Sequence, residues 1–336
     1  MKNNRLAWGD SLKGYLILLV VLGHAIQNTL GLDCYNDHLW NLIYSFHMPA
    51  FMAISGYFAY RPSGLGGANY VVNTLFRRFR QLVVPFLLWT VISLVIHQDF
   101  TLSSISSIIL YPDYGLWFLW VLFWINVIFV IGSWFAELIR IKQEYVIITL
   151  CGVLAATMVI FEIRVLGFQF IAYYFLFYSL GYYLNKYQDR ILFLNNRLAI
   201  IILFAFWIVL AWNWKMHELP QFLKQIPLPG ALLQYFYRFL TAAIAVFLLV
   251  TISPKFLNDE GKWNVPFVRL GYYSLGIYAV HFIFIGIIVN LLLNELGLGQ
   301  SFVIIISFIA ASALSWLMVW MLSKWSVSSK WLLGKI

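Results

Sequence analysis

Long apolar runs alternate with short polar stretches along the whole chain. Each run holds about 17 to 25 residues, the length that an α-helix needs to cross the hydrocarbon core of a bilayer. The link between the fifth and sixth runs, which contains Glu162 and Arg164, is very short. Residues 145–184 could therefore form one re-entrant hairpin instead of two spans. The pattern predicts ten membrane-spanning helices, near residues 12–31, 40–60, 81–97, 115–136, 145–161, 165–184, 198–213, 231–252, 269–293 and 301–323.

Composition supports this class of protein. Hydrophobic residues make up 62% of the chain and charged residues 10%, whereas about 25% of a typical globular domain is charged. We therefore predict an all-α, polytopic membrane helical bundle. The sequence shows no internal repeat, low-complexity tract or flexible linker, which favours a single domain over residues 1–336. No small-residue cleavage site follows the first run, so we expect neither a removable signal peptide nor a soluble domain.

The 22 Lys and Arg residues outnumber the 13 Asp and Glu residues, and their distribution points to a membrane rather than to nucleic acid. Eighteen of the basic residues fall on the N-terminal side of the predicted membrane. Only Arg164, Lys215 and Lys224 fall in the opposite loops. Because cytoplasmic segments carry the excess of Lys and Arg, this asymmetry predicts that both termini are cytoplasmic.

Four ionisable side chains are predicted deep inside the membrane, on four different spans: His24, His47, Arg238 and His281. Lys13 and His24 lie on the same face of the predicted helix. The helical rise between them places His24 roughly 16 Å deeper in the membrane than Lys13. Since a charged side chain that faces lipid is costly, we expect all four to face one interior cavity. Imidazole, with an unperturbed pKa of about 6.5, suits a general base. Arg238 suits the stabilisation of a developing negative charge.

Two other interpretations of the histidines stay open. In one, they are neutral, hydrogen-bonded core residues. In the other, His24, His47 and His281 bind a metal ion. No carboxylate or thiolate is predicted beside them, and Cys34 and Cys151 are too few for a disulfide framework or a thiolate metal site. We therefore expect no metal.

A second candidate site is the basic run Arg77, Arg78 and Arg80, at the predicted cytoplasmic end of the third span. Arg5 and Lys13 are expected at the same side of the membrane. Such a cluster either binds anionic lipid head groups or holds the phosphates of a cytosolic donor. The run alone does not separate these two functions.

Five motifs occur in order along the whole chain. They are Arg5 to His24 with Asp10, Lys13 and Gly14; Phe46-His47-Met48-Pro49 with Ser55-Gly56; the basic run before Pro85-Phe86; Leu116-Trp117-Phe118-Leu119; and Gly271 to His281 with Ser274 and Tyr278. Together they resemble the motifs of the acyltransferase 3 family of membrane proteins, in particular its fucose 4-O-acetylase-like branch. Two features depart from that pattern: Gln81 stands where relatives often carry a basic residue, and we expect no SGNH-type esterase domain after the last span.

The resemblance implies transfer of an acyl group, usually acetyl from acetyl-CoA, to a sugar hydroxyl of a cell-surface polysaccharide or its lipid-linked precursor, in a bacterial inner membrane. It implies that His24 is the base or a transient acyl acceptor. It also implies that His47, Arg238 and His281 orient the acceptor or stabilise the oxyanion. The residues it implies for the donor are Arg5, Asp10, Lys13, Arg77, Arg78 and Arg80, and those for the acceptor substrate are Ser55, Trp117, Ser274 and Tyr278.

A transporter or flippase of a polar lipid-linked sugar is the alternative function, since a charged cavity at the membrane midplane is also typical of carriers. The chain shows no repeated half that would favour it. A third class, the MBOAT-type acyltransferases, carries an Asn or Asp paired with a His, which we do not find convincingly in this sequence.

Overall fold

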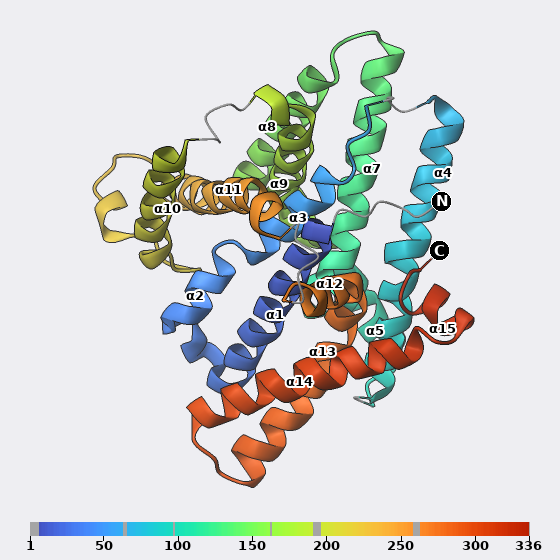
Figure 1. The fold of residues 1–336 in the computed structure, drawn as a ribbon, viewed down its shortest axis with the longest axis vertical. Coiled ribbons are helices and arrows are strands. Elements are labelled where there is room, and N and C mark those ends of the chain that lie inside the picture. Colours follow the sequence, from blue (N-terminus) through green and yellow to red (C-terminus); the bar gives the residue numbers. More distant parts are fainter. Residues whose placement is uncertain are drawn as a thin grey trace. The chain divides into compact units, whose positions relative to one another are not determined.

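The computed structural model describes residues 7–62, 66–96, 98–161, 163–190, 196–257 and 263–335, and these form helices joined by short loops (Figure 1). The predicted donor residue Arg5 lies outside the described residues, as do the basic residues Lys2 and Lys262. The α-helices are α1 (Ala7–Leu30), α2 (His38–Tyr44), α3 (His47–Tyr57), α4 (Ala68–Arg78), α5 (Val84–Ile96), α6 (Leu102–Leu110), α7 (Trp117–Leu138), α8 (Gln143–Phe161), α9 (Phe168–Lys186), α10 (Arg197–Trp212), α11 (Gly230–Phe256), α12 (Val265–Tyr272), α13 (Ser274–Val289), α14 (Gln300–Leu322) and α15 (Ser326–Trp331). Shorter segments are the 3-10 turns η1 (Gly31–Asn36), η3 (Pro112–Tyr114), η4 (Val165–Gly167), η5 (Gln188–Arg190) and η7 (Gln221–Leu223), and the π-helical turns η2 (Phe79–Val83) and η8 (Asn290–Glu295).

In the described part of the chain, eight helices are long and apolar enough to cross a membrane, and α10 is a shorter apolar helix. The segments Gln143–Phe161 and Val165–Lys186 are two of the eight, so the 145–184 region holds two full-length helices rather than one hairpin. The remaining predicted span, 40–60, consists of α2 and α3. The protein is a polytopic helical membrane protein, and helices occupy all ten of the predicted spans.

The predicted span over 40–60 is broken between Tyr44 and His47. Pro49 lies in the first turn of α3, where its missing N–H costs no helical hydrogen bond, whereas a continuous helix would lose one. The end of α2 leaves carbonyl groups without helical partners. The hydroxyl of Ser45 donates to the Leu42 carbonyl, and the His47 ring bonds the Ile43 carbonyl. The break therefore holds His47 at the start of a helix.

A π-helical turn interrupts the third predicted span immediately after Arg77 and Arg78. The Val84 N–H bonds the Phe79 carbonyl five residues back, and the next residue, Pro85, has no N–H to offer to the Gln81 carbonyl. A Cβ at Gly334 would overlap that carbonyl, and Gly334 has a φ of +62°. The C-terminal segment thus lies against the turn. Such turns are frequent at functional sites.

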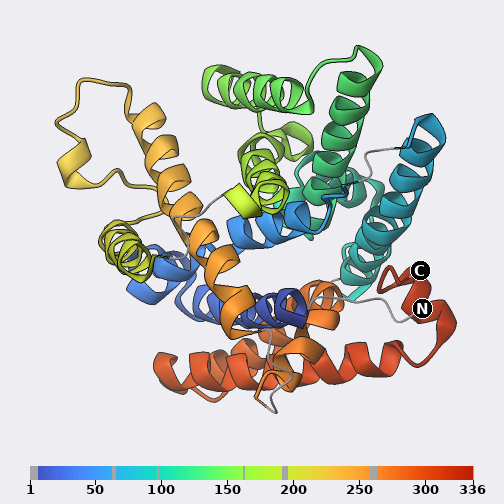
Figure 2. The same ribbon diagram turned by 45° about the horizontal axis from the view of Figure 1, so that its top comes forward.

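The chain divides into two compact units. Unit 1 comprises Met1–Ile54 and Tyr187–Val319, and unit 2 comprises Ser55–Lys186 and Trp320–Ile336. In unit 1, α1 packs against α12 and α13 (Figure 1). The helices α10 and α11 cross and pack against each other (Figure 2). In unit 2, α7 packs against α4, α8 and α9.

The backbones of α1 and α12 approach closely in unit 1. A Cβ at Gly14 would overlap the carbonyl oxygen of Phe267, and a Cβ at Gly271 would overlap that of Asp10. The two contacts are reciprocal: each helix contributes one glycine and one backbone carbonyl, four residues apart. Small residues allow membrane helices to approach this closely. The Tyr15 ring stacks on Phe267 beside this contact, at 3.9 Å between centroids. The two glycines therefore fix how α1 lies against α12 and against α13, which follows it.

Candidate functional site

The structure brings three of the predicted site residues of unit 1 together: His24 on α1, His47 on α3 and His281 on α13. The ring centroids of His24 and His281 lie 5.2 Å apart. The Phe282 ring packs edge-on against His24 at 4.8 Å. Tyr44 connects the third histidine, because its ring lies 4.8 Å from His47 and 6.3 Å from His24. We call these three histidines with Tyr44 the histidine cluster.

Hydrogen bonds determine which nitrogen of two rings carries the proton. The Nδ1 of His281 lies 2.7 Å from the Tyr278 carbonyl oxygen, and the Nδ1 of His47 lies 2.7 Å from that of Ile43. A carbonyl oxygen only accepts, so both Nδ1 atoms carry hydrogen. In the neutral ring each Nε2 then keeps its lone pair. The Nε2 of His281 is buried and has no hydrogen-bond partner among the described residues.

His24 has a different set of partners. Its Nδ1 is buried and has no hydrogen-bond partner in the described part of the chain. The Gln27 side chain, one turn along α1, interacts with the ring. The Gln27 Oε1 accepts from the Tyr44 hydroxyl at 2.9 Å. Gln27 therefore connects Tyr44 to His24 within the histidine cluster.

Arg238 is half-buried on α11 and lies over the Trp214 ring, with its guanidinium carbon 5.5 Å from the ring centroid. Trp214 forms a buried cluster with Leu210 and Tyr237, and Tyr44 packs against that cluster. Arg238 is thus linked to the histidine cluster through Trp214 and Tyr44.

At the start of α1, Asp10 and Lys13 form an ion pair of 3.6 Å. Asp10 is buried, with 7% of its surface exposed, and its backbone carbonyl lies at the close approach of α1 to α12. The two predicted donor residues are therefore positioned by the helix crossing rather than lying free in solvent.

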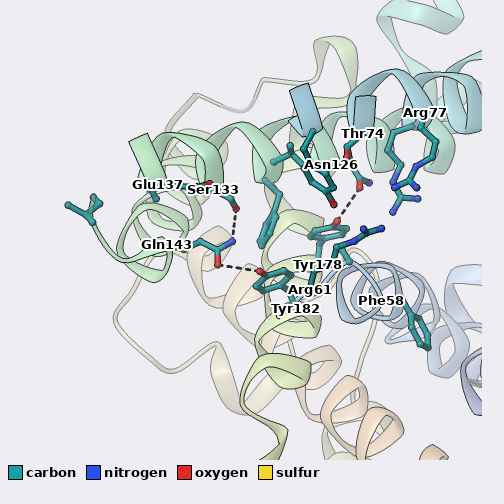
Figure 3. A pocket seen from close by; sticks show the side chains of 17 residues that line it. Phe58, Arg61, Thr74, Arg77, Asn126, Ser133, Glu137, Gln143, Tyr178 and Tyr182 are labelled. Carbon is teal, nitrogen blue, oxygen red and sulfur yellow. Dashed lines mark hydrogen bonds between the residues drawn. The ribbon is translucent and has the colours of Figure 1, made fainter. Parts of the chain in front are cut away.

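Unit 2 contains a pocket of about 270 Å³ between α4, α7 and α9. Arg61, Arg77 and Arg78 line it, together with Glu137. Figure 3 shows Arg61 and Arg77 toward one side of the pocket and Glu137, Ser133 and Gln143 toward the other. Pockets for small ligands have volumes of about 300–1,000 Å³, so this pocket suits one part of a large donor.

Hydrogen bonds hold the pocket wall in place (Figure 3). The Tyr178 hydroxyl donates to Asn126 Oδ1 at 3.1 Å. The Tyr182 hydroxyl donates to Gln143 Oε1 at 3.3 Å, and the amide of Gln143 donates to Ser133 at 2.6 Å. The wall is consequently rigid and polar.

The side chain of Arg78 is directed by Gln81, whose Oε1 accepts from Nη1 at 3.2 Å. Its Nε is buried and has no hydrogen-bond partner among the described residues. Gln81, the residue that departs from the family pattern, therefore contacts Arg78, one of the three arginines that line the pocket.

Five other predicted residues are Arg80, Ser55, Trp117, Ser274 and Tyr278, and of these Tyr278 lies beside the histidine cluster. Arg80 is outside the pocket, over the Phe76 ring at 5.9 Å. Trp117 stacks on Phe170 and Tyr174 of α9 at 4.9 and 5.2 Å. Ser55 precedes Gly56, where α3 meets the Tyr178 carbonyl. Ser274 begins α13, one turn before Tyr278, whose buried ring lies 5.8 Å from His281.

The sequence interpretation missed several residues of both sites. Tyr44, Gln27 and Trp214 belong to the surroundings of the histidine cluster, and Arg61 and Asn126 belong to the pocket. One signal existed for Asn126, a polar residue inside a long apolar run.

Within the residues described, no group of three or more His, Cys, Asp or Glu side chains is arranged to hold a metal ion.

Comparison with known proteins places the chain in a family. Residues 6–320 match the family model described as an acyltransferase domain. The chain is 42% identical over 92 residues to the nodulation protein NolL of Sinorhizobium fredii. The matched region covers 26% of this chain and 24% of that protein. It is 35% identical over 133 residues to the nodulation protein NolL of Mesorhizobium japonicum. This matched region covers 36% of this chain and 34% of that protein. The chain thus spans 24% and 34% of the length of these two curated relatives, and no solved structure matches it. The family match extends over nearly the whole chain, and the protein belongs to the acyltransferase 3 family of membrane acyltransferases.

Proposed function

We propose that this protein transfers an acetyl group from acetyl-CoA to a sugar hydroxyl of a cell-surface polysaccharide or of its lipid-linked precursor, in a bacterial inner membrane. Family membership supports acyl transfer, and the similarity to two rhizobial proteins supports a bacterial setting. We also place the chain in the fucose 4-O-acetylase-like branch, on its five motifs. The observation that carries the proposal is the pair of neighbouring imidazoles, the half-buried His24 and the buried His281, with ring centroids 5.2 Å apart.

In the proposed reaction His24 is the general base. With the ring proton on Nε2, the unpartnered Nδ1 is the basic nitrogen. Nδ1 takes the proton of the sugar hydroxyl as the oxygen attacks the thioester carbonyl carbon. The tetrahedral intermediate then expels the coenzyme A thiolate, which receives that proton from the imidazolium. The products are the O-acetyl ester and free coenzyme A.

The other residues of unit 1 orient the acceptor and stabilise charge in this proposal. His281 offers a buried Nε2 with a lone pair, which can accept from a second hydroxyl. Arg238, linked to the histidine cluster through Trp214, is assigned to the oxyanion of the intermediate. Burial of His47 and His281 limits the access of water, which would otherwise hydrolyse the thioester.

For the donor we propose the pocket of unit 2. Three arginines suit the phosphates of coenzyme A, because guanidinium groups bind phosphate oxygens in pairs. Of the predicted donor residues, Arg77 and Arg78 line the pocket, and the structure adds Arg61. Asp10, Lys13, Arg5 and Arg80 remain candidates from the family resemblance.

The test compares O-acetylation of surface glycans in a deletion strain and its parent. We expect acetate esters to disappear on deletion, to return with the wild-type gene and not to return with His24→Ala. With purified protein, acetyl-CoA and glycan from the deletion strain, His24→Ala should lower the rate at least about 100-fold, the effect of a missing general base. His38→Ala is the matched control, because His38 is exposed and stacks on Trp212. Unchanged acetylation in the deletion strain would refute the function, and a flippase would change the amount of surface glycan instead.

A further inference from the structure

Residues 332–335, which follow α15, are attached at two points to the long helical segment Ala68–Ile96 that carries Arg77 and Arg78. The indole N–H of Trp89 on α5 donates to the Leu332 carbonyl at 2.9 Å. Gly334 lies against η2, where an added Cβ would overlap the Gln81 carbonyl. Leu333, between these two contacts, is only 5% exposed. The segment is therefore a packed part of unit 2.

Hydrogen bonds within the chain fix the path of this segment. The Ser328 hydroxyl donates to the Leu322 carbonyl at 2.6 Å and so ties α15 to the end of α14. The N–H of Leu333 donates to the Ser328 carbonyl at 3.3 Å, and the N–H of Lys335 donates to that of Ser329 at 3.0 Å. The helix α15 also packs on α5 (Figure 1). The approach of Gly334 to η2 is consequently set by several bonds on either side of it.

Two independent requirements for glycine meet at position 334. Its φ of +62° lies in the left-handed region, which residues with a side chain adopt at a cost. The Gln81 carbonyl lies where a Cβ would be, and Pro85 offers no N–H to cover that carbonyl from within the helix. Gly334 therefore determines how near the segment comes to the Gln81 backbone.

Gln81 connects this contact to the pocket of unit 2. Its Oε1 accepts from Nη1 of Arg78 at 3.2 Å. Arg78 lines the pocket together with Arg61 and Arg77, and the positive charges of these two act on it and repel it. A neutral acceptor that holds the guanidinium against this repulsion fixes its direction. The direction of Arg78 thus depends on where the Gln81 backbone lies.

We propose that residues 332–335 are a positioning element of the pocket: they act through Gln81 on Arg78 and so set the affinity of the pocket for the phosphates of its ligand. None of these four residues is among those that line the pocket. They also lie beyond residues 6–320, which match the family model, so family membership assigns them no role. That the ligand is the acyl donor rests on the proposed function.

The experiment measures the Kd for coenzyme A of the purified full-length protein by isothermal titration calorimetry. Gly334→Ala should raise this Kd about threefold to tenfold, the effect of one misplaced hydrogen bond. Gly297→Ala is the matched control. Its φ of +63° gives the same backbone strain, but a Cβ there would meet no described heavy atom within 4 Å, so its Kd should equal that of the wild type. Trp89→Phe removes the N–H at the other attachment point and should raise Kd as Gly334→Ala does.

A double-variant cycle separates positioning through Gln81 from a general loss of structure. Gln81→Ala removes the acceptor of Arg78, so adding Gly334→Ala to it should raise Kd little further. In transfer assays Gly334→Ala should raise KM for acetyl-CoA, with kcat and the acceptor KM unaltered, whereas a merely structural defect would lower kcat. Thermal unfolding verifies that each variant is folded at the assay temperature.

Equal Kd values for Gly334→Ala and Gly297→Ala overturn the inference. So does a Gly334→Ala effect that is as large in the Gln81→Ala background as in the wild type, or a wild type that does not bind coenzyme A. Coenzyme A binding that responds to these variants as expected, without acetyl transfer, leaves the positioning element standing and refutes the proposed function. Acetyl transfer with an unchanged donor KM in Gly334→Ala does the reverse.

Discussion

Adding one methyl group at the crossing of α1 and α12 tests whether that crossing sets the geometry of the histidine cluster. In Gly271→Ala the new Cβ would overlap the carbonyl group of Asp10, and in Gly14→Ala it would overlap that of Phe267. Because both obstacles are backbone atoms, no side-chain rotation relieves the overlap and the helices must separate. Only Tyr273 lies between α12 and α13, so a shift of α12 also moves His281 relative to His24.

Two opposing effects set the size of the change in stability. Alanine is favoured over glycine inside a helix by about 0.8–1.0 kcal/mol. Overpacking a well-filled interior costs about 1–3 kcal/mol, and an overlap with rigid backbone belongs at the upper end of that range. The net destabilisation of Gly271→Ala should therefore be about 1–2 kcal/mol.

The assay is thermal unfolding of the purified variants at a single scan rate, together with the rate of acetyl transfer. Gly271→Ala and Gly14→Ala should each lower the apparent Tm by a few degrees and reduce transfer more than a loss of folded protein explains. Gly286→Ala on α13 is the matched control, since a Cβ there would meet no described heavy atom within 4 Å, and it should be neutral or stabilising. If Gly271→Ala is as stable and as active as Gly286→Ala, the close crossing does not determine the site.

Three further predictions concern the site and the topology. Arg78→Ala should raise KM for acetyl-CoA, and this increase should become smaller in high salt. Arg197→Ala, at an exposed position, should leave KM for acetyl-CoA unchanged. Equal KM values for the two variants would indicate that the arginines bind lipid head groups instead of the donor. His281→Asn keeps a donor toward the Tyr278 carbonyl but removes Nε2, so it should fold normally and lose at least about 10-fold in transfer rate; an active His281→Asn would remove Nε2 from the mechanism. Reporter fusions after residues 37 and 335 should lie on opposite sides of the membrane, and a shared side would contradict the charge asymmetry.

The sequence was sufficient to predict the helices and the proximity of His24 to His281. Helix rise and span direction place His24 and His281 at similar depth, and their rings are neighbours in the structure. Hydropathy did not reveal the break before His47, because an apolar run looks the same whether or not the backbone is continuous. Pro49 was the local signal for that break.

The pocket in unit 2 could not be predicted because the rotation of each helix about its axis is not encoded in an apolar pattern. Lipid and protein interior are equally apolar, so faces of α7 and α9 are not distinguished by hydrophobicity. The bond between Tyr178 and Asn126 joins residues 52 positions apart, and it depends on that rotation. Arg80 was expected with Arg77 and Arg78, but the π-helical turn that begins at Phe79 changes the phase of the helix there.

The short helix α10 has a consequence for the surrounding lipid. Its 16 residues extend about 24 Å, less than the roughly 30 Å of an average hydrocarbon core. A crossing by this helix creates hydrophobic mismatch, which a bilayer relieves by thinning locally. Arg238 on α11 lies over Trp214, which follows α10, so thinning around α10 would act beside the residue proposed for the oxyanion. Lipids with longer acyl chains would then slow the enzyme without touching any residue of the site.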